Sequence, residues 1–423
     1  MSKVIQKFSA AEKGWMLYDW ANSGFSLIVV TAVLPLWLES VGHNVNLSTA
    51  QTTSWWSYAN SFSTLIVAIC SPILGALADF KGWKKPSWFI ATILGVVTTL
   101  SLAMVPNNGF WWLLVLFLLA NIGFSVANIY YDSFLTDVTS PNKMPTVSSW
   151  GFALGYLGGV IPFILFYLVR GLMTTHQSIM LAFILSGLWW AIFSIPMLLT
   201  VKQKSALPVP NNPLKQVFKR LTNTLRHLAQ YPKIVGFLAA YFFYIDGVNT
   251  IITEASLFAV SLGIKMTELL TILLFVQLVA FPASIIFGYL TKCFSERTMI
   301  LAGISIYSII CLLSLIITQA WGFWIMAFLI GSAQGGIQAI SRSYFGKIIP
   351  QAYSGEFFGF YNIFGKFSAV LGPLVFGGVA ALTGSVQLGS GSLLIFFVLG
   401  GWIFIKYGRL QESSEHRMFL KDF

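Results

Sequence analysis

Two apolar stretches of the chain carry the same pattern of polar side chains. The first comprises Asp19, Asn22, Ser23 and Ser26, and the second comprises Asp246, Asn249, Thr250 and Thr253. The shared spacing i, i+3, i+4, i+7 places the four side chains of each stretch on one face of an α-helix. A carboxylate at the centre of a membrane helix costs about 2.5–3.5 kcal/mol, so two matched faces predict a shared, water-accessible interior. Bonding of serine or threonine to its own helix explains single residues of this kind, but not the matched set.

A second correspondence joins the segments 128–134 and 338–344. Asp132 in the first segment occupies the position of Arg342 in the second, and the amide of Asn128 matches that of Gln338. Four polar residues also line one helix face in this part of the chain: Asn121, Ser125, Asn128 and Asp132. The opposite charges at equivalent positions could pair with each other across the chain, or each could bond within its own half.

Glu254 and Lys366 complete the intramembrane ionisable set. Asp19 and Asp246 lie about 22–30 Å below the outer ends of their predicted spans, and Glu254 lies about 12 Å nearer the outside than Asp246. Lys366 is the only basic residue well inside a predicted span, so we expect it to pair with a carboxylate, although a lysine near a helix end can instead reach the headgroups. Carboxylates in such a cavity can exchange protons, and an acid with an amine suits a zwitterion. Aromatic residues near the stripes are candidate lining residues: Tyr18, Trp20, Tyr130, Tyr131, Tyr244 and Tyr361.

The composition indicates which elements hold these residues. The chain has 423 residues, of which 57% are hydrophobic and 9% charged, whereas a soluble domain is about 25% charged, so a soluble enzyme is excluded. Long apolar runs predict an all-α integral membrane protein. We expect twelve transmembrane helices, at roughly 14–38, 52–78, 87–105, 111–136, 146–169, 178–200, 234–262, 268–290, 298–317, 321–345, 355–380 and 390–408.

The positive charge follows the predicted spans. The net charge is +11, which in a soluble protein would suggest a nucleic-acid partner. With both termini in the cytoplasm, every Lys and Arg falls in an inner segment or at the inner end of a span except Arg170, Lys265 and Lys366. This distribution follows the positive-inside rule. It predicts a multi-pass protein of the bacterial plasma membrane with cytoplasmic termini, in contact with lipid and without nucleic acid.

One long polar segment divides the spans six and six. Residues 201–233 hold four prolines and seven basic residues, which predicts a basic cytosolic linker between six-helix bundles at 1–200 and 234–423. Within it, Val217, Leu221, Leu225 and Leu228 recur at helical spacing. The segment from Lys215 is therefore either an amphipathic helix at the inner membrane face or a solvated linker.

The loop after the second span carries a recognisable motif. It reads Gly75-Ala-Leu-Ala-Asp79-Phe80-Lys81-Gly82-Trp83-Lys84-Lys85, which resembles the signature of the major facilitator superfamily, with Phe80 in place of a basic residue. The resemblance implies two pseudo-symmetric six-helix bundles and a cytosolic gating motif. Physically, a carboxylate such as Asp79 can cap the N-terminus of a neighbouring helix, while Gly75 permits close helix approach. An ordinary charged turn explains the lysines equally well, but not the Gly75 to Asp79 spacing.

A narrower resemblance rests on segments of spans 1, 7 and 11. The segments 15–25 and 246–252, with 364–366 leading to Leu371-Gly372-Pro373, look like the vacuole-effluxer-like group of that superfamily, long called "unknown major facilitator" and named after a yeast vacuolar amino-acid effluxer. The resemblance covers nearly the whole chain. It implies export of neutral amino acids such as leucine and tyrosine.

The sequence therefore predicts a secondary active transporter that works by alternating access. We expect proton-coupled movement of a small zwitterionic solute, in the efflux direction, by a monomer. Eight residues are the expected substrate or proton sites: Asp19, Asn22, Asn128, Asp132, Asp246, Asn249, Glu254 and Lys366. The alternative within transport is an exporter of amphipathic or cationic compounds.

Other classes of function lack their sequence signals. The chain has no HExxH, GxSxG or ATP-binding loop, and its four His and three Cys are scattered without metal-ligand spacing. We therefore expect no enzyme activity, cofactor or metal. A receptor without transport would not need matched charged stripes in both halves of the chain.

Overall fold

The structure, a computed structural model, describes residues 7–227 and 231–407. Twelve helices in this part of the chain are long and apolar enough to cross a membrane, which confirms the predicted all-α membrane fold. Before the linker the elements are α1 Ala10–Gly24, η1 Phe25–Val33, α2 Leu34–Asn44, α3 Thr49–Ala78, α4 Lys84–Leu102, α5 Phe110–Val138, α6 Met144–Val169, η2 Arg170–Leu172 and α7 Thr175–Thr200. After it they are α8 Pro213–His227, α9 Pro232–Ser261, α10 Met266–Leu290, α11 Glu296–Ile316, α12 Ala320–Ile348, η4 Gln351–Tyr353, α13 Ser354–Thr383, α14 Val386–Ser392 and α15 Leu394–Tyr407.

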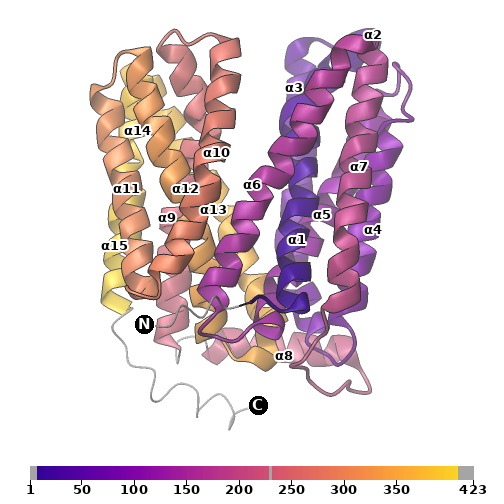
Figure 1. The fold of residues 1–423 in the computed structure, drawn as a ribbon, viewed down its shortest axis with the longest axis vertical. Helices are drawn as coiled ribbons and strands as arrows, with labels where there is room; N and C mark the ends of the chain where they lie inside the picture. Colours follow the sequence, from indigo (N-terminus) through magenta and orange to yellow (C-terminus); the bar gives the residue numbers. More distant parts are fainter. Residues whose placement is uncertain (1–6, 228–230, 408–423) are drawn as a thin grey trace.

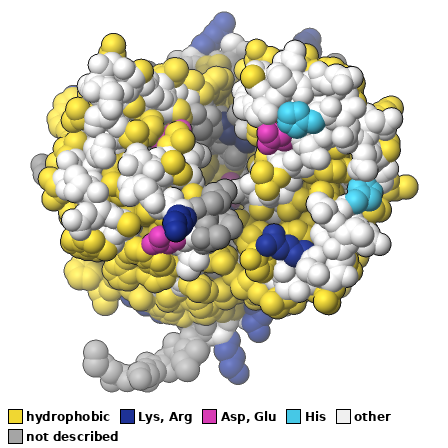
Figure 2. Space-filling view, turned by 90° about the horizontal axis from the view of Figure 1, so that it is seen from above, with side chains coloured by type: hydrophobic (Ala, Val, Ile, Leu, Met, Phe, Trp, Pro, Cys, Tyr) yellow, Lys and Arg dark blue, Asp and Glu magenta, His cyan; other side chains and the backbone are white. Residues whose placement is uncertain are grey.

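The helices form two groups that meet at only one end. Helices α1–α7, here the N-terminal bundle, and α9–α15, here the C-terminal bundle, spread apart at the upper end in Figure 1 and converge at the lower end, beside α8. We call these the open end and the closed end. A view onto the open end shows a hollow between the bundles (Figure 2). Helix α1 begins and α15 ends at the closed end (Figure 1).

Local sequence signals explain where several spans begin. Ser9, Ser48 and Thr174 each cap a helix in a reciprocal capping box with a Glu or Gln three residues later, at the starts of α1, α3 and α7. Such boxes satisfy backbone N–H groups that have no partner within the helix. Large apolar side chains such as Leu168, Leu199 and Leu374 are exposed on the outside of the bundles, where a bilayer would cover them.

The first span is irregular where sequence periodicity predicts a plain helix. Residues Phe25–Val33 form a π-helix between α1 and α2, and the Thr31 hydroxyl donates to the carbonyl of Ser26 at 3.0 Å. Pro35 stands at the start of α2. Because proline has no N–H to offer the preceding turn, the regular hydrogen-bond ladder is interrupted there, and a π-helix is one way to continue the span.

The linker contains a helix that docks on the closed end. The buried face of α8 carries Val217 and Leu221, which pack with Ala76 and Phe80 of the N-terminal bundle. Leu225, expected on that apolar face, is instead 57% exposed, while Leu228 lies outside the described residues. Ahead of α8, Leu207 donates its N–H to the Asp79 carbonyl at 2.8 Å, so the linker is tied to the motif loop. The solvated-linker alternative is therefore wrong for α8. The basic residues Lys3, Arg409, Arg417 and Lys421 also lie outside the described residues.

Candidate functional site

The guanidinium of Arg342 joins the two bundles near the closed end. Arg342 of α12 donates from Nη1 to Asp132 Oδ1 of α5 at 3.0 Å and from Nη2 to Asp19 Oδ2 of α1 at 3.3 Å. Its Nε donates to the Ser148 hydroxyl of α6 at 3.0 Å, and Nη2 also reaches the Ser148 carbonyl at 3.2 Å. Of the two arrangements left open for Asp132 and Arg342, the structure has the pair that crosses between the bundles.

Aromatic rings enclose this ionic cluster. The Arg342 guanidinium lies 4.7 Å from the ring centroid of Trp15 and 4.4 Å from that of Phe152, in the range of cation–π attraction. The Tyr131 hydroxyl donates to Asp19 Oδ2 at 2.7 Å, and the Trp15 indole donates to the Tyr131 carbonyl at 2.8 Å. These contacts fix Asp19 in position and exclude solvent from the guanidinium.

The cluster contains more negative than positive charge. The Arg342 side chain is 4% exposed, whereas those of Asp19 and Asp132 are 16% and 15% exposed. Two ionised carboxylates facing one guanidinium leave a net charge of −1, and a charge in such surroundings is disfavoured. One proton shared by the pair would neutralise the cluster, and that proton would belong to the pair rather than to one residue.

Asp246, the counterpart of Asp19 in the seventh span, has a different environment. Its two carboxylate oxygens accept from the backbone N–H of Gly372 at 3.0 Å each, and the Thr250 hydroxyl lies at 3.4 Å. A β-carbon at Gly372 would fall 2.6 Å from Asp246 Oδ1, so only glycine fits here. Gly372 precedes Pro373, which lies inside α13 and has no N–H to donate within the helix. Asp246 therefore binds α9 to the part of α13 next to this proline, within the C-terminal bundle.

The polar face of α5 continues from Asp132 toward the open end. Asn128 accepts from the Asn22 amide of α1 at 2.8 Å, and Asn121 donates to the Ser63 hydroxyl of α3 at 2.7 Å. Between them, Ser125 accepts from the Lys366 ammonium of α13 at 3.1 Å. The expected carboxylate partner of Lys366 is absent, since no carboxylate among the described residues lies within 4.0 Å of it. The three nearby carboxylates have other partners: Asp19 and Asp132 accept from Arg342, and Asp246 accepts from the Gly372 N–H.

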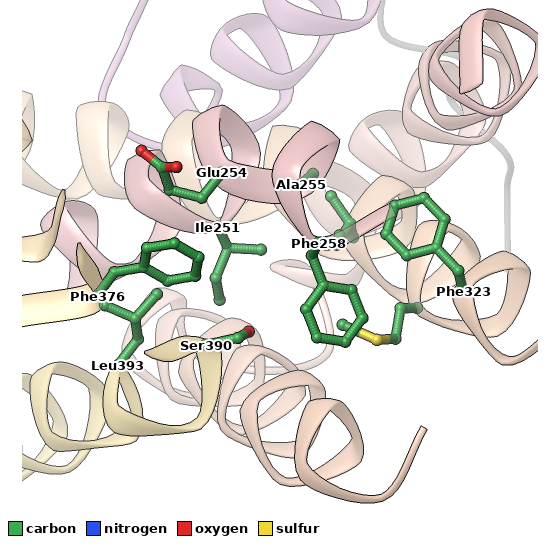
Figure 3. A pocket seen from close by; sticks show the side chains of 10 residues that line it. Ile251, Glu254, Ala255, Phe258, Phe323, Phe376, Ser390 and Leu393 are labelled. Atoms are coloured by element: carbon green, nitrogen blue, oxygen red, sulfur yellow. The ribbon is translucent and has the colours of Figure 1, made fainter. Parts of the chain in front are cut away.

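Glu254 lies apart from the ionic cluster, seven residues before the end of α9. It borders a small cavity of about 10 Å³ in the C-terminal bundle, room for about one water molecule. Figure 3 shows its carboxylate directed away from Phe258 and Ser390. No described residue donates a hydrogen bond to it. Asn249, one turn closer to Asp246, likewise has a side chain without a hydrogen bond to the described part of the chain.

The aromatic residues expected to line the cavity divide into two groups. Tyr18 and Tyr244 are wrong as lining residues, because both are 0% exposed inside their own bundles. The Tyr18 hydroxyl is bonded to Thr92 at 3.1 Å and that of Tyr244 to Ser341 at 2.7 Å. Consecutive residues on a helix differ by about 100° in direction, so Tyr18 points away from the face that holds Asp19. Of the other expected lining residues, Trp20 stacks on Trp189, Tyr130 is buried at 3% exposure, and Tyr361 stacks on Tyr241.

The motif loop meets the second bundle at the closed end. Asp79 accepts from the backbone N–H groups of Gly355 and Glu356 at 2.7 and 3.1 Å, at the start of α13. A β-carbon on Gly75 would lie 2.1 Å from the Gly355 carbonyl oxygen, so α3 and α13 touch through their backbones. Gly82 has a φ of 80°, which glycine adopts without strain, and Lys81 and Lys85 of the same loop form no ion pair with a described residue.

Two basic residues also contact both sides of the closed end: Lys84, which belongs to the predicted gating motif, and Arg220, which does not. Arg220 of α8 is buried, with its guanidinium bonded to Asp79 at 3.0 Å and to Glu356. Lys84 is 0% exposed and contacts Asp137 at 2.9 Å and Ser354 at 2.8 Å. In sequence both residues look like ordinary positive-inside charges. The absence of a nearby acid in sequence hints at a distant partner for Arg220 alone, since Asp79 lies five residues before Lys84.

Comparison with known proteins agrees with this fold. The family model described as "Vacuole effluxer Atg22 like" matches residues 10–144 and 137–408. The MFS-type transporter YxiO of Bacillus subtilis (strain 168) is 43% identical over 94% of this chain and 94% of its own length. Autophagy-related protein 22 of Vanderwaltozyma polyspora is 24% identical, over 97% of this chain and 94% of its own.

Solved structures show the same architecture at low sequence identity. The transporter FucP in the outward conformation matches with a TM-score of 0.70 and 15% identity, over 96% of this chain and 99% of FucP. The proton:xylose symporter XylE matches with a TM-score of 0.71 and 12% identity, over 94% of each chain. These likenesses confirm the major facilitator fold. The chain belongs to the vacuole effluxer Atg22-like family and is a multi-pass membrane transporter of the major facilitator superfamily, not an enzyme.

Proposed function

We propose that this chain is a secondary active transporter that exports a small amino-acid-like solute in exchange for protons. The observation that carries the proposal is the shared guanidinium of Arg342, which comes from one bundle and is bonded to Asp19 and Asp132 of the other. This contact between the bundles has two carboxylates and one guanidinium. A proton that binds to either carboxylate therefore weakens the attraction that holds the bundles together.

The closed end corresponds to the cytosol in this proposal. The exposed lysines Lys81 and Lys292 lie in loops at that end, as does the basic helix α8. Positive charge is retained on the cytoplasmic side of membranes. The hollow between the bundles then faces outward, the termini are cytoplasmic, and a plasma-membrane location follows for a bacterial cell. The two bundles act as rigid units joined by the linker, and the protein works as a monomer.

A proton arriving from outside starts the cycle. When it binds to the Asp19–Asp132 pair, one of the two charges that hold Arg342 disappears and the inter-bundle contact weakens. The bundles then separate at the closed end, which requires that the Gly75–Gly355 contact and the Asp79 bonds to α13 break together. In the inward-facing state the carboxylates meet cytosolic water, release the proton and accept Arg342 again after the solute has bound.

The family relationship supports the efflux direction, because the matching family model describes a vacuole effluxer. The amino-acid-like solute follows from what the resemblance of the sequence to this group implies. Export of amphipathic or cationic compounds is the competing proposal. It is supported by Glu254, whose carboxylate has no hydrogen-bond partner among the described residues. This carboxylate and the apolar side chains of Phe258 and Phe376 border one cavity, and together they would suit a hydrophobic cation. An assay that includes both solute classes separates the two.

Gradient-driven release of solute from proteoliposomes tests the proposal. Vesicles holding purified protein are loaded with labelled leucine or tyrosine, or with a hydrophobic cation, and a proton gradient directed inward or none is applied. We expect the gradient to accelerate amino-acid release in the wild type, and Asp132→Asn to abolish that acceleration. Glu39→Gln, an exposed carboxylate near the end of α2, is the matched control. Release that ignores the gradient, or release of the cation alone, would refute proton-coupled amino-acid export.

A further inference from the structure

The ammonium of Lys366 is the feature that the transport cycle above leaves unused. Lys366 lies on α13 of the C-terminal bundle, and its Nζ donates to the Ser125 hydroxyl of α5 in the other bundle at 3.1 Å. Ser125 itself is 4% exposed and Lys366 is partly buried. The lysine therefore spans the gap between the bundles inside the membrane.

This ammonium has no counter-charge in the described part of the chain. Asp19 and Asp132 are held by Arg342, and Asp246 by the Gly372 N–H. The Lys366 contact with Ser125 offers only a hydroxyl oxygen, and no described carboxylate lies within 4.0 Å. Cations in membrane spans are normally paired or face a water-filled cavity. An ammonium that is always unpaired at this depth is costly. An anion from outside the chain would remove that cost by pairing with it.

The surroundings offer hydrogen-bond donors at the right depth. Ser125 lies seven residues from Asp132 along α5, which places Lys366 about 10 Å on the open-end side of the Arg342 cluster. One turn below Ser125, Asn128 and Asn22 form an amide pair at 2.8 Å. A carboxylate at Lys366 would meet an ammonium and a hydroxyl, and two nearby amides, without competing with the acids that bind Arg342.

We propose that Lys366 and Ser125 form the receptor for the carboxylate of the transported solute. The inference rests on the proposed function and narrows its substrate class to solutes that carry a free carboxylate, so hydrophobic cations are excluded. The solute carboxylate supplies the missing counter-charge and replaces the Ser125 hydroxyl as a partner of Lys366. Solute and proton then occupy separate sites, with the solute on the open-end side.

Binding in detergent, without any proton gradient, tests this receptor. The probes are the twenty standard amino acids, with leucinamide and leucinol as matched compounds without a carboxylate, and the readout is the rise in apparent Tm on ligand binding. We expect at least one amino acid to stabilise the wild type while leucinamide and leucinol do not. Lys366→Met should lose this stabilisation, with a Kd about tenfold or more higher. Lys366→Arg should retain part of it, and Ser125→Ala should weaken it less than Lys366→Met.

Two controls show whether a variant loses binding only because it is misfolded. Ligand-free Lys366→Met should melt at the same or a higher temperature than the wild type, because it removes an unpaired buried charge. Lys265→Met, an exposed lysine at the start of α10, lowers the net charge equally and should bind as the wild type does.

Three results would overturn the receptor: no amino acid stabilises the wild type, the compounds without a carboxylate stabilise it equally, or Lys366→Met binds unchanged. A lower ligand-free Tm for Lys366→Met would also contradict the absence of a counter-charge. Failure of the proposed function looks different, because carboxylate-selective binding would persist while the proton gradient left release unchanged.

Discussion

The two matched polar stripes of this transporter have the same spacing and different partners. On the first, Asp19 reaches across to Arg342 of the other bundle, while Asn22 bonds to Asn128. On the second, Asp246 accepts a backbone N–H of its own bundle, and Asn249 makes no side-chain bond to a described residue. One stripe holds the bundles together and the other holds a single bundle in shape.

The difference teaches that a repeated pattern fixes where polar groups lie but not what they bind. Asp19 contacts Arg342 of the other bundle, so this contact must break whenever the closed end opens. Asp246 bonds to α13 beside Pro373, within one bundle, so its contact need not break when the bundles separate. We therefore assign motion to the first stripe and stability to the second, and substitutions should separate these roles.

The largest effect is expected from Arg342→Gln. This change leaves Asp19 and Asp132 buried without their shared partner, and breaking a buried ion pair from one side costs about 3–5 kcal/mol. We expect a lower apparent Tm and no gradient-driven release, measured on purified protein and in proteoliposomes. Adding Asp19→Asn and Asp132→Asn should restore the Tm but not the coupling. Wild-type coupling in Arg342→Gln would remove the functional meaning of the first stripe.

A smaller and purely structural effect is expected at Asp246. Asp246→Ala leaves the Gly372 N–H without its acceptor, which costs about 1–3 kcal/mol. Asp246→Asn retains an acceptor oxygen and should lose less. Thermal unfolding should report these losses, while the ratio of release with and without the proton gradient stays at the wild-type value in Asp246→Asn. A coupling defect in that variant, at normal stability, would show that the second stripe also takes part in transport.

The smallest effect distinguishes the two asparagines. Asn22→Ala removes a neutral amide bond between α1 and α5, worth about 0.5–1.5 kcal/mol. Asn249→Ala, its matched control, removes no bond to a described residue and should leave the Tm unchanged. Equal losses in the two variants, compared by thermal unfolding in the same detergent, would mean that the stripes are energetically alike.

The positions of the stripes could be predicted because helical spacing and apolar context are local properties. The membrane helices follow from hydropathy for the same reason. Their partners could not be predicted, since Arg342 lies more than three hundred residues from Asp19 and the spacing contains no information on how the bundles dock. Lys366 shows this limit most clearly, because its acid partners were plausible in sequence but are bound elsewhere.

Other differences also have physical causes. Tyr18 and Asp19 are neighbours in sequence, yet a helix turns them to different faces, and Tyr18 is buried in the N-terminal bundle. Arg220 and Lys84 fit the inner loops by charge alone, and their burial at the closed end depends on the docking of α8 and α13. The π-helix after Gly24 has only Pro35 as a signal, which indicates an interruption but not its form.

The distance between the bundles at the closed end tests the central claim most directly. Spin labels at Lys81→Cys and Lys292→Cys, in a protein whose Cys70, Cys293 and Cys311 are replaced, would report that distance by pulsed electron resonance as the pH is lowered from about 8 to about 5, where buried carboxylates take up protons. We predict a shift to longer distances in the wild type and no pH response when Asp19→Asn and Asp132→Asn are combined. A wild-type distance that does not change with pH, or the same response in the double variant, would contradict proton control of the Arg342 contact.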